Sequence, residues 1–453
     1  MRILLWHGYL LTGSGSNVYT ANVARSWRAS GHDVVVMCQE TLAGVLPYVD
    51  AEADMAADNS TFVEYPTKAD PAAGRCRVVR PAIGEILPVY VYDEYEGFTA
   101  KLYVDLSDEE LEDYVRRNVE ALVTAIRDHR PEAIVTGHEV MGPYIARLAC
   151  EATNTTYVAK LHGSALEFAV KRQDRYRHYA YEGLIAAKRV VGGSNYMVGA
   201  AAAVVPGWES RAAVVNPGCD VDLFGPAERD PSAPPTVGFV GKLIAAKGVH
   251  HFLAALGATT TPDLRAVVVG YGGFEKELRA LAYTMSTGNP AAARKVATGP
   301  EPLPDLAAFL DSSQADEAYW ERAADVPVEF AGRLEHGPLS ETLPSWDVLV
   351  VPSVGPEAFG MVAAEAAACG VLPVVPRHSG IGEVGVTLEQ ELGAPGLLTY
   401  DPGEPVTGIA ERIDAILALP YDQRHALELR AAELARKRWS WETVAGRLLE
   451  LAS

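Results

Sequence analysis

The sequence has few cysteines, and their spacing suggests neither a disulfide framework nor a metal site. There are five, an odd number scattered along the chain, with no Cys-x-x-Cys pair: Cys38, Cys76, Cys150, Cys219 and Cys369. Disulfide scaffolds and zinc sites show regular, paired spacings, so neither is expected here. Reduced thiols are typical of cytoplasmic proteins, and we expect a cytoplasmic location.

Long apolar runs and an excess of positive charge are also missing. No run approaches the ~20 apolar residues that cross a bilayer, and the apolar start at residues 1–7 is too short for the core of a signal peptide. Asp and Glu total 59 against 39 Lys and Arg, which gives a formal net charge of −20. This acidity disfavours nucleic acids and anionic lipid surfaces, so we expect no nucleic-acid partner and no stable membrane association.

Length and hydrophobic content indicate a folded protein with more than one core. The chain has 453 residues, of which 49% are hydrophobic, and this length exceeds one ordinary domain. Apolar runs alternate with helical patterns, which is typical of α/β proteins with parallel sheets. The Pro-rich stretch at 226–235 is the best linker candidate, because the same order of elements restarts after it.

We therefore expect an N-terminal domain at residues 1–222 and a C-terminal domain at 223–437. A final amphipathic helix at 438–453 is expected to pack back on the first domain. Residues 40–112 are predicted to be irregular. Residues 284–324 are interpreted as an insertion with one amphipathic piece, because loops this long are uncommon inside compact domains.

Acidic residues gather between Asp93 and Asp113. One interpretation is a solvated face that leads into a helix capped at Ser107. The other is an acceptor-side surface for a polar or cationic small molecule. The sequence leaves both open.

A glycine-containing loop follows the first predicted strand, at residues 7–17. It faces the start of a predicted helix at 18–29, where free amides favour a phosphate. The loop does not have the GxGxxG spacing of nicotinamide-binding proteins. A phosphate-binding loop and a plain tight turn both fit this pattern.

The stretch from Asp347 to Pro376 is predicted to form a strand, a loop, a helix and a second strand. A Val-rich run stops at Pro352, turn-forming residues follow, and an Ala-rich run continues to Gly370. In such a unit the loop at the strand's carboxyl end meets the helix N-terminus, where a phosphate is favoured.

Two predicted strands in the first half lead into a histidine. The buried runs at 133–137 and 157–161 are followed directly by His138 and His162. One such histidine is more often structural. Two at equivalent strand ends favour a site, because doubly wound folds bind ligands there.

Residues 347–383 resemble the donor-site signature of retaining GT-B glycosyltransferases, specifically glycosyltransferase family 4. The resemblance rests on Glu357, the Ala-Phe-Gly that follows it, and Glu365 eight positions later, all after a Val-rich strand and Pro-Ser. Further matches lie at 216–224, 241–248, 270–272 and 332–334, whereas roughly 45–110 and 284–324 do not match. The resemblance implies an α/β fold of the GT-B type, with two Rossmann-like doubly wound domains facing across a cleft.

The implied activity is transfer of a sugar, with retention of configuration, from a nucleotide sugar to a hydroxyl of a small soluble acceptor. A UDP-sugar is the expected donor. The departing diphosphate gains charge, which Lys242 and Lys247 would stabilise. Lys242 stands where the family has Arg, and Lys offers phosphate a point charge in place of a bidentate fork. No cofactor and no metal are expected, since no convincing Asp-x-Asp motif is present.

The resemblance also assigns roles to individual residues. Glu357 would hold the hydroxyls of the donor sugar, Glu365 the ribose, and His162 would sit beside the donor sugar. Acceptor-side candidates are His138, Tyr92 and Glu94. Glu383 fits either a donor contact or an ordinary helix cap. The other donor and nucleotide contacts would be Gly15, Ser16, Gly241, Arg333, Leu334, Ala358, Phe359, Gly360, Met361 and Val362.

Three other functions are compatible with parts of this pattern. A glycoside hydrolase also uses two carboxylates, but they must flank one bond at ~5 to 9.5 Å, and the lysine loop has no part in that mechanism. A GT-B sugar-nucleotide epimerase would share the donor site. A non-catalytic protein that binds nucleotide sugars is the third possibility.

Overall fold

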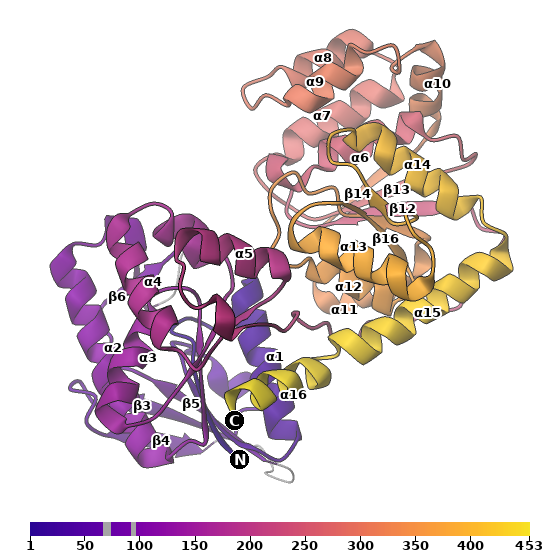
Figure 1. Cartoon of the computed structure of the whole chain (residues 1–453). Helices are drawn as coiled ribbons and strands as arrows, with labels where there is room; N and C mark the ends of the chain where they lie inside the picture. The colour runs from indigo at the N-terminus through magenta and orange to yellow at the C-terminus, as the bar shows by residue number, and fades with distance from the viewer. Residues whose placement is uncertain (67–73, 92–96) are drawn as a thin grey trace. The chain divides into compact units, whose positions relative to one another are not determined.

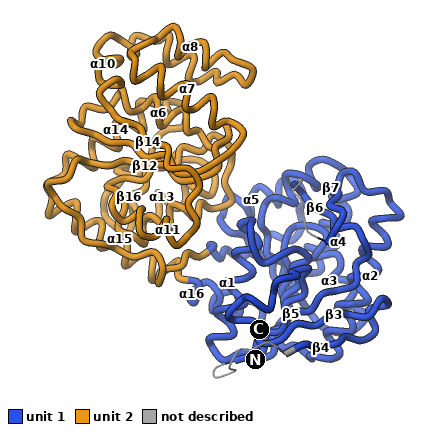
Figure 2. The backbone as a smooth tube through the Cα atoms, turned by 180° about the vertical axis from the view of Figure 1, so that it is seen from behind, with its two compact units in different colours: residues 1–217, 441–453 blue, residues 218–440 orange. Residues whose placement is uncertain are grey.

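Two parallel sheets organise the chain, one in each of two units (Figure 2). The structure is a computed structural model, and it describes residues 1–66, 74–91 and 97–453. Unit 1 comprises Met1–Pro217 and Trp441–Ser453, and unit 2 comprises Gly218–Ser440. The domain boundaries expected from the sequence, after residues 222 and 437, stay predictions.

Unit 1 contains a nine-stranded sheet in the order β11-β10-β9-β8-β1-β2-β5-β3-β4. Its strands pair in parallel, apart from the antiparallel β3 and β4 at one edge. The central strands are buried on both faces, which explains their continuous apolar sequence. The strands are β1 (Arg2–Trp6), β2 (Asp33–Met37), β3 (Ala51–Met55), β4 (Phe62–Pro66), β5 (Arg75–Arg80), β8 (Ala133–Gly137), β9 (Val158–Lys160), β10 (Arg189–Gly192) and β11 (Ala212–Val214).

The helices of unit 1 begin with α1 (Gly15–Ala29), which buries Tyr19, Val23 and Trp27 as their four-residue spacing predicts. The last helix, α16 (Trp441–Ala452), packs against α1, and the two lie side by side in Figure 1. The indole nitrogen of Trp27 donates to the carbonyl of Ala445 at 2.9 Å. The others are α2 (Asp108–His129), α3 (Gly142–Thr153), α4 (Asp174–Ala186) and α5 (Asn195–Val204).

The region from 40 to 112 was predicted to be irregular, and this prediction is wrong. It contains β3, β4 and β5 of the main sheet and a small parallel pair, β6 (Ile86–Val89) and β7 (Thr99–Leu102). In β3 the acidic residues Glu52 and Asp54 alternate with buried ones, and Arg80 of β5 pairs with both, at 2.5 and 2.6 Å. Because of these charged residues the segment was not recognised as a strand in the sequence, although the other face of β3 is apolar. The cap predicted at Ser107 is confirmed, since its hydroxyl accepts the amide of Glu110 at 3.1 Å.

Unit 2 contains a six-stranded parallel sheet in the order β14-β13-β12-β15-β16-β17. Its strands are β12 (Thr236–Val240), β13 (Arg265–Val269), β14 (Val328–Gly332), β15 (Val348–Val350), β16 (Leu372–Pro376) and β17 (Thr399–Tyr400). Its helices include α6 (Val249–Ala258), α7 (Glu275–Ser286), α11 (His336–Thr342), α12 (Met361–Ala368), α13 (Ser379–Leu392), α14 (Pro405–Leu417) and α15 (Tyr421–Trp439).

Two expectations about unit 2 need correction. Residues 284–324 are not loop with one amphipathic piece, because they form α8 (Pro290–Ala297), α9 (Pro304–Leu310) and α10 (Glu317–Asp325). Buried Tyr319 of α10 donates its hydroxyl to the carbonyl of Ala254 in α6 at 3.0 Å, so this region is part of the core. The predicted linker at 226–235 lies inside unit 2, where Arg229 forms ion pairs with Asp347 and Glu428.

Each unit is therefore a doubly wound α/β structure built around one main sheet, as predicted from the alternation of apolar runs and helical patterns. Among the described residues, none of the helices combines the length and the apolar character needed to cross a membrane. All five cysteines are buried and free.

Candidate active site

The stretch from β15 to β16 forms the predicted strand, loop, helix and strand. The loop ends at Gly360, which has φ 110° and precedes the first residue of α12. A Cβ at this position would lie 2.1 Å from Cδ1 of Ile381, so only glycine fits. Within the described part of the chain, no side chain caps the start of α12. Its first amides are therefore available to a ligand.

Glu357 is fixed in the loop ahead of α12 by three contacts. Its carboxylate forms an ion pair with the ammonium group of Lys247, and the hydroxyl of Ser353 donates to the same carboxylate at 2.7 Å. Its amide donates to the hydroxyl of Ser379 at 3.0 Å. The structure therefore brings together Lys247 and Glu357, which the sequence analysis assigned to the diphosphate and the sugar.

The sequence analysis missed His378, which joins the two serines around Glu357. Its Nε2 donates to the carbonyl of Ser353 at 2.8 Å, and its Nδ1 lies 3.0 Å from the hydroxyl of Ser379. Because a carbonyl only accepts, Nε2 carries the proton and Nδ1 accepts from Ser379. His378 lies within the matched range 347–383, but the resemblance assigned no role to it.

The loop that carries Lys247 packs against the end of β15. A Cβ on Gly248, at φ 68°, would lie 1.8 Å from the carbonyl oxygen of Pro352, which explains the glycine. The carbonyl of Ala246 accepts the amides of Val354 and Gly355, at 2.9 and 3.1 Å. Gly241 begins this loop, and Lys242 directly follows it with an exposed side chain.

The turn after β14 carries Arg333 and Leu334. The guanidinium of Arg333 lies 5.0 Å from the centre of the Tyr271 ring and pairs with Glu335 at 2.8 Å. Tyr271 is 47% exposed and follows β13. Together these residues form an exposed planar surface at the carboxyl end of neighbouring strands, of a kind on which a base can stack. Leu334 is half-buried against the core.

Glu365 lies inside α12 and is only 7% exposed. Burial, assisted by the charge of Asp220, raises the pKa of Glu365 to about 7. Nε2 of His336 lies 3.8 Å from the carboxylate. A buried carboxyl with one distant partner is costly unless a ligand satisfies it.

The five residues from Ala358 to Val362 differ in what they can offer a ligand. Phe359 is buried with its ring edge-on to Trp439, so its side chain belongs to the core and only its backbone can reach a ligand. Met361 and Val362 are half-buried and pack on the core. The amides after Gly360 remain the main contribution of this segment.

In unit 1, Gly15 and Ser16 form the first turn of α1, and Gly15 is exposed. The loop before them is tied to β1 through His7. Asn17 donates its side-chain amide to the carbonyl of Thr12 at 2.6 Å, which turns its oxygen toward Nε2 of His7 at 2.8 Å. Nε2 of His7 therefore carries the proton, and burial lowers the pKa of His7 to about 4. This uncharged histidine fixes the glycine loop.

Three neighbouring strand ends of unit 1 bring three histidine rings together. His7 follows β1, His138 follows β8 and His162 lies two residues after β9. The ring of His138 lies 5.7 Å from that of His7 and 4.9 Å from that of His162. Burial and the neighbouring imidazoles lower the pKa of both His138 and His162 well below the usual range. The cluster is therefore uncharged near neutral pH.

Of the three proposed acceptor residues, His138 lies in the described part of the chain. His138 is 1% exposed, and neither of its ring nitrogens has a hydrogen-bond partner among the described residues. Its ring is covered by Tyr9 and Tyr90, at 5.2 and 4.9 Å. His162 is half-buried and keeps some exposed surface. Tyr92 and Glu94 lie outside the described residues.

Sequence reasoning also missed two buried charged residues beside His162, namely Glu139 and Lys160. Glu139 accepts the amide of Gly163 at 2.8 Å, and Lys160 donates to the carbonyl of Val215 at 3.1 Å. The signal was present, since both are charged residues at the end of an apolar strand. Within the described ranges, no cluster of three or more His, Cys, Asp or Glu side chains is placed to hold a metal ion.

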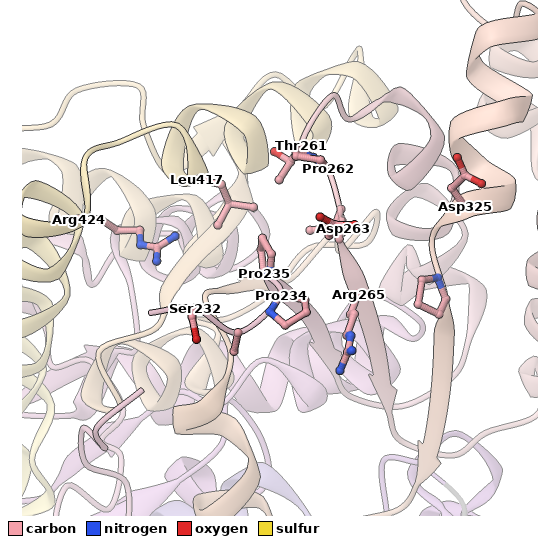
Figure 3. A pocket seen from close by; sticks show the side chains of 13 residues that line it. Ser232, Pro234, Pro235, Thr261, Pro262, Asp263, Arg265, Asp325, Leu417 and Arg424 are labelled. Carbon is pink, nitrogen blue, oxygen red and sulfur yellow. The ribbon is translucent and has the colours of Figure 1, made fainter. Parts of the chain in front are cut away.

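A depression of about 570 Å³ in unit 2 is lined by none of these candidate residues. Figure 3 shows its lining. Its lining includes Pro235, Arg265 and Pro327, which stand at the starts of β12, β13 and β14. The candidate donor residues follow the carboxyl ends of the strands, where doubly wound folds bind ligands. Arg424 in this depression already pairs with Asp347 and Glu428. This depression is therefore not part of the candidate donor site.

Comparison with known families matches both halves of the chain. Residues 14–218 match the model of a glycosyl transferase 4-like domain, and residues 313–434 match that of glycosyl transferases group 1. The first match lies in unit 1 apart from its last residue, and the second lies in unit 2.

Among curated proteins, the chain is similar to two D-inositol 3-phosphate glycosyltransferases. It is 27% identical to that of Corynebacterium urealyticum over 404 residues, which cover 83% of this chain and 84% of the relative. It is 29% identical to that of Mycobacterium tuberculosis (strain H37Ra) over 248 residues, which cover 53% of this chain but 43% of the relative.

Two solved structures share the fold across the whole chain. Sucrose-phosphate synthase from Thermosynechococcus elongatus has a TM-score of 0.60 at 18% identity, covering 100% of this chain and 98% of its own. The Anabaena protein HepE in complex with UDP also has a TM-score of 0.60 at 18% identity, covering 99% of both chains.

Proposed function

This chain belongs to the GT-B glycosyltransferases of the family 4 type, and we propose that it moves a sugar from a nucleotide-sugar donor to a hydroxyl of a small polar acceptor. The donor in this proposal is a UDP-sugar, and the sugar keeps its anomeric configuration. The similarity to HepE, whose structures contain UDP and UDP-glucose, supports the choice of base. The similarity to D-inositol 3-phosphate glycosyltransferases supports a small polyol or its phosphate as the acceptor class to try first.

The observation that carries the proposal is the arrangement of Glu357 and Lys247 ahead of α12. A carboxylate fixed by a lysine and by Ser353 can accept hydrogen bonds from sugar hydroxyls without being displaced. The lysine is held against Glu357, four residues ahead of Met361, where α12 begins and its uncapped amides favour a diphosphate. Glu365, buried and poorly paired, gains a partner if it binds the ribose.

The departing diphosphate must be stabilised as its bond to the sugar breaks. Lys247, Lys242 and the amides after Gly360 supply fixed positive groups for this, so the proposal requires no metal. The departing phosphate would assist removal of the proton from the acceptor hydroxyl, as the resemblance implies. His162 would position the donor sugar and need not form a bond to it. The five free thiols agree with a reducing compartment, and a cytoplasmic location is part of the proposal.

Product analysis tests this proposal. The full chain is incubated with UDP-glucose and with other UDP-sugars, with and without a panel of polyols and polyol phosphates, and the products are identified by NMR. A new glycoside with the anomeric configuration of the donor is expected only when an acceptor is present. A changed sugar nucleotide without acceptor would favour an epimerase. Binding of the donor without any product across the panel would favour a binding protein.

A further inference from the structure

Glu139 is a buried carboxyl at the end of β8, directly after His138. It is 1% exposed, and its Oε1 accepts the amide of Gly163 at 2.8 Å. Its other oxygen has no hydrogen-bond partner among the described residues. Burial raises the pKa of Glu139, whereas the amides of Gly163, Leu166 and His162 lower it. The carboxyl therefore lies at the start of the helical segment that follows His162.

Lys160 is the last residue of β9, two positions before His162. It is 2% exposed, donates to the carbonyl of Val215 at 3.1 Å, and lies 5.0 Å from the centre of the Tyr19 ring. That ring meets His162 edge-on at 5.2 Å. Burial lowers the pKa of Lys160 to about 7, and the attraction of Glu139 opposes this.

The two residues hold the chain on both sides of His162. Lys160 ties the strand end before the histidine, and Glu139 ties the amide directly after it. Burying a carboxyl and an ammonium group costs free energy that apolar side chains of similar size avoid. Ionisable groups retained at such a cost gather at functional sites.

We propose that Glu139 and Lys160 are positioning residues for His162, which fix the chain on both sides of it. This inference rests on the proposed function, because it gives the pair a role in the transfer reaction. The charge of Lys160, together with the imidazoles of His138 and His7, disfavours protonation of His162. Among the described residues, three tyrosines contact rings of this cluster, namely Tyr19 from α1, Tyr9 after β1 and Tyr90 after β6.

The test uses the full chain and the variants Glu139→Gln and Lys160→Met. Gln keeps an oxygen that can accept the amide of Gly163 but removes the charge, and Met keeps most of the length of Lys. The matched control is Asp50→Asn in the same unit. Like Glu139, Asp50 accepts a backbone amide, that of Cys76 at 2.7 Å. It is paired with Arg28 at 2.7 Å.

The first readout is the titration of the His162 ring by nitrogen-15 NMR, assigned with His162→Gln. Both test variants are expected to shift the His162 signals, whereas Asp50→Asn leaves them unchanged. Lys160→Met also removes a positive charge, so it should bring the protonation of His162 closer to neutral pH. Unchanged His162 signals in both test variants would overturn the proposal. This measurement needs no turnover. It therefore tests the positioning role of Glu139 and Lys160 even if no sugar is transferred and the proposed function is wrong.

The second readout separates kcat from KM. We expect the test variants to lower kcat about tenfold or more, which is ~1.4 kcal/mol, and to change the donor KM by less than about threefold. The pH profile of kcat should shift in Lys160→Met, which removes a charge that disfavours protonation of His162. A loss of kcat no larger than that of Asp50→Asn, with the same pH profile as the wild type, would contradict the proposal. If Glu139→Gln does not fold, Lys160→Met decides alone, and Lys160→Arg is expected to restore part of kcat.

Discussion

Lys247 and Glu357 lie 110 positions apart in the chain and form an ion pair in unit 2. One follows β12 and the other follows β15, and these strands are neighbours in the sheet. The ion pair therefore places a cation at the end of one strand beside a carboxylate at the end of the next. The proposed donor site depends on this relationship.

Replacing either partner of this pair should reduce transfer strongly. Lys247→Met removes a cation proposed to stabilise the diphosphate, and we expect kcat/KM to fall about 100-fold. Glu357→Gln should cause a loss of similar size, and the double variant should lose less than the sum, because each change already breaks the ion pair. Steady-state kinetics of the four proteins measures this coupling. Lys276→Met, at an exposed lysine of α7, is the control, and a similar loss there would contradict the assignment.

The pH dependence of stability should reveal Glu365. Its pKa is raised from 4.5 to about 7 in the folded chain, so the folded state holds this proton more tightly than the unfolded state does. The resulting stability is full below pH 4.5 and is lost as the pH rises through 7, at about 1.4 kcal/mol per pH unit between these values.

Glu365→Gln escapes this loss, so its melting temperature relative to the wild type should be higher at pH 8 than at pH 5. Thermal unfolding at the two pH values measures the difference. Exposed Glu321→Gln in α10 serves as the control and should show no such change. An equal difference at both pH values for Glu365→Gln would mean that the carboxyl is not strained by burial.

Gly360→Ala should destabilise unit 2 and weaken nucleotide binding together. The residue has φ 110°, and a Cβ would meet Cδ1 of Ile381 at 2.1 Å. A non-glycine residue in this conformation costs ~1–3 kcal/mol, which denaturant unfolding measures. Adding Ile381→Ala makes space but leaves the backbone strain, so it should recover only part of the loss. Gly337→Ala, where a Cβ meets nothing within 4 Å, should be close to neutral.

Chelation of divalent metals should leave transfer unchanged. The proposal assigns the stabilisation of the leaving diphosphate to Lys242, Lys247 and the amides of α12. Initial rates with and without EDTA, in protein first dialysed against the chelator, measure this. A loss that added Mg²⁺ or Mn²⁺ restores would show that a metal shares the role of the lysines.

The sequence predicted the elements whose pattern is local and strong. The strand, loop and helix around Glu357 follow from an apolar run, turn residues and an Ala-rich run, and the cap at Ser107 follows from its spacing to Glu110. The four-residue spacing of Tyr19, Val23 and Trp27 is local in the same way and matches the buried face of α1. These features depend on neighbours in the sequence.

The remaining features depend on contacts between distant segments. Strand β3 was missed because its acidic residues meet Arg80, which the sequence does not place beside them. Helix α10 was missed because Tyr319 packs on α6, 65 positions away. The ion pair of Lys247 with Glu357, and the closeness of His7, Glu139 and Lys160 to the His162 loop, likewise require the order of strands in each sheet. The periodicity of apolar residues along the sequence does not specify the order of strands in a sheet.

The most direct test of the central claim is a calorimetric titration of the full chain with UDP, GDP, ADP and TDP. We expect saturable binding of one nucleotide to one site, with UDP the tightest, and clearly weaker binding by Glu365→Ala at pH 8. The exposed-site variant Glu321→Ala should bind like the wild type. Absence of binding by all four nucleotides would contradict the assignment of a nucleotide-sugar site to unit 2.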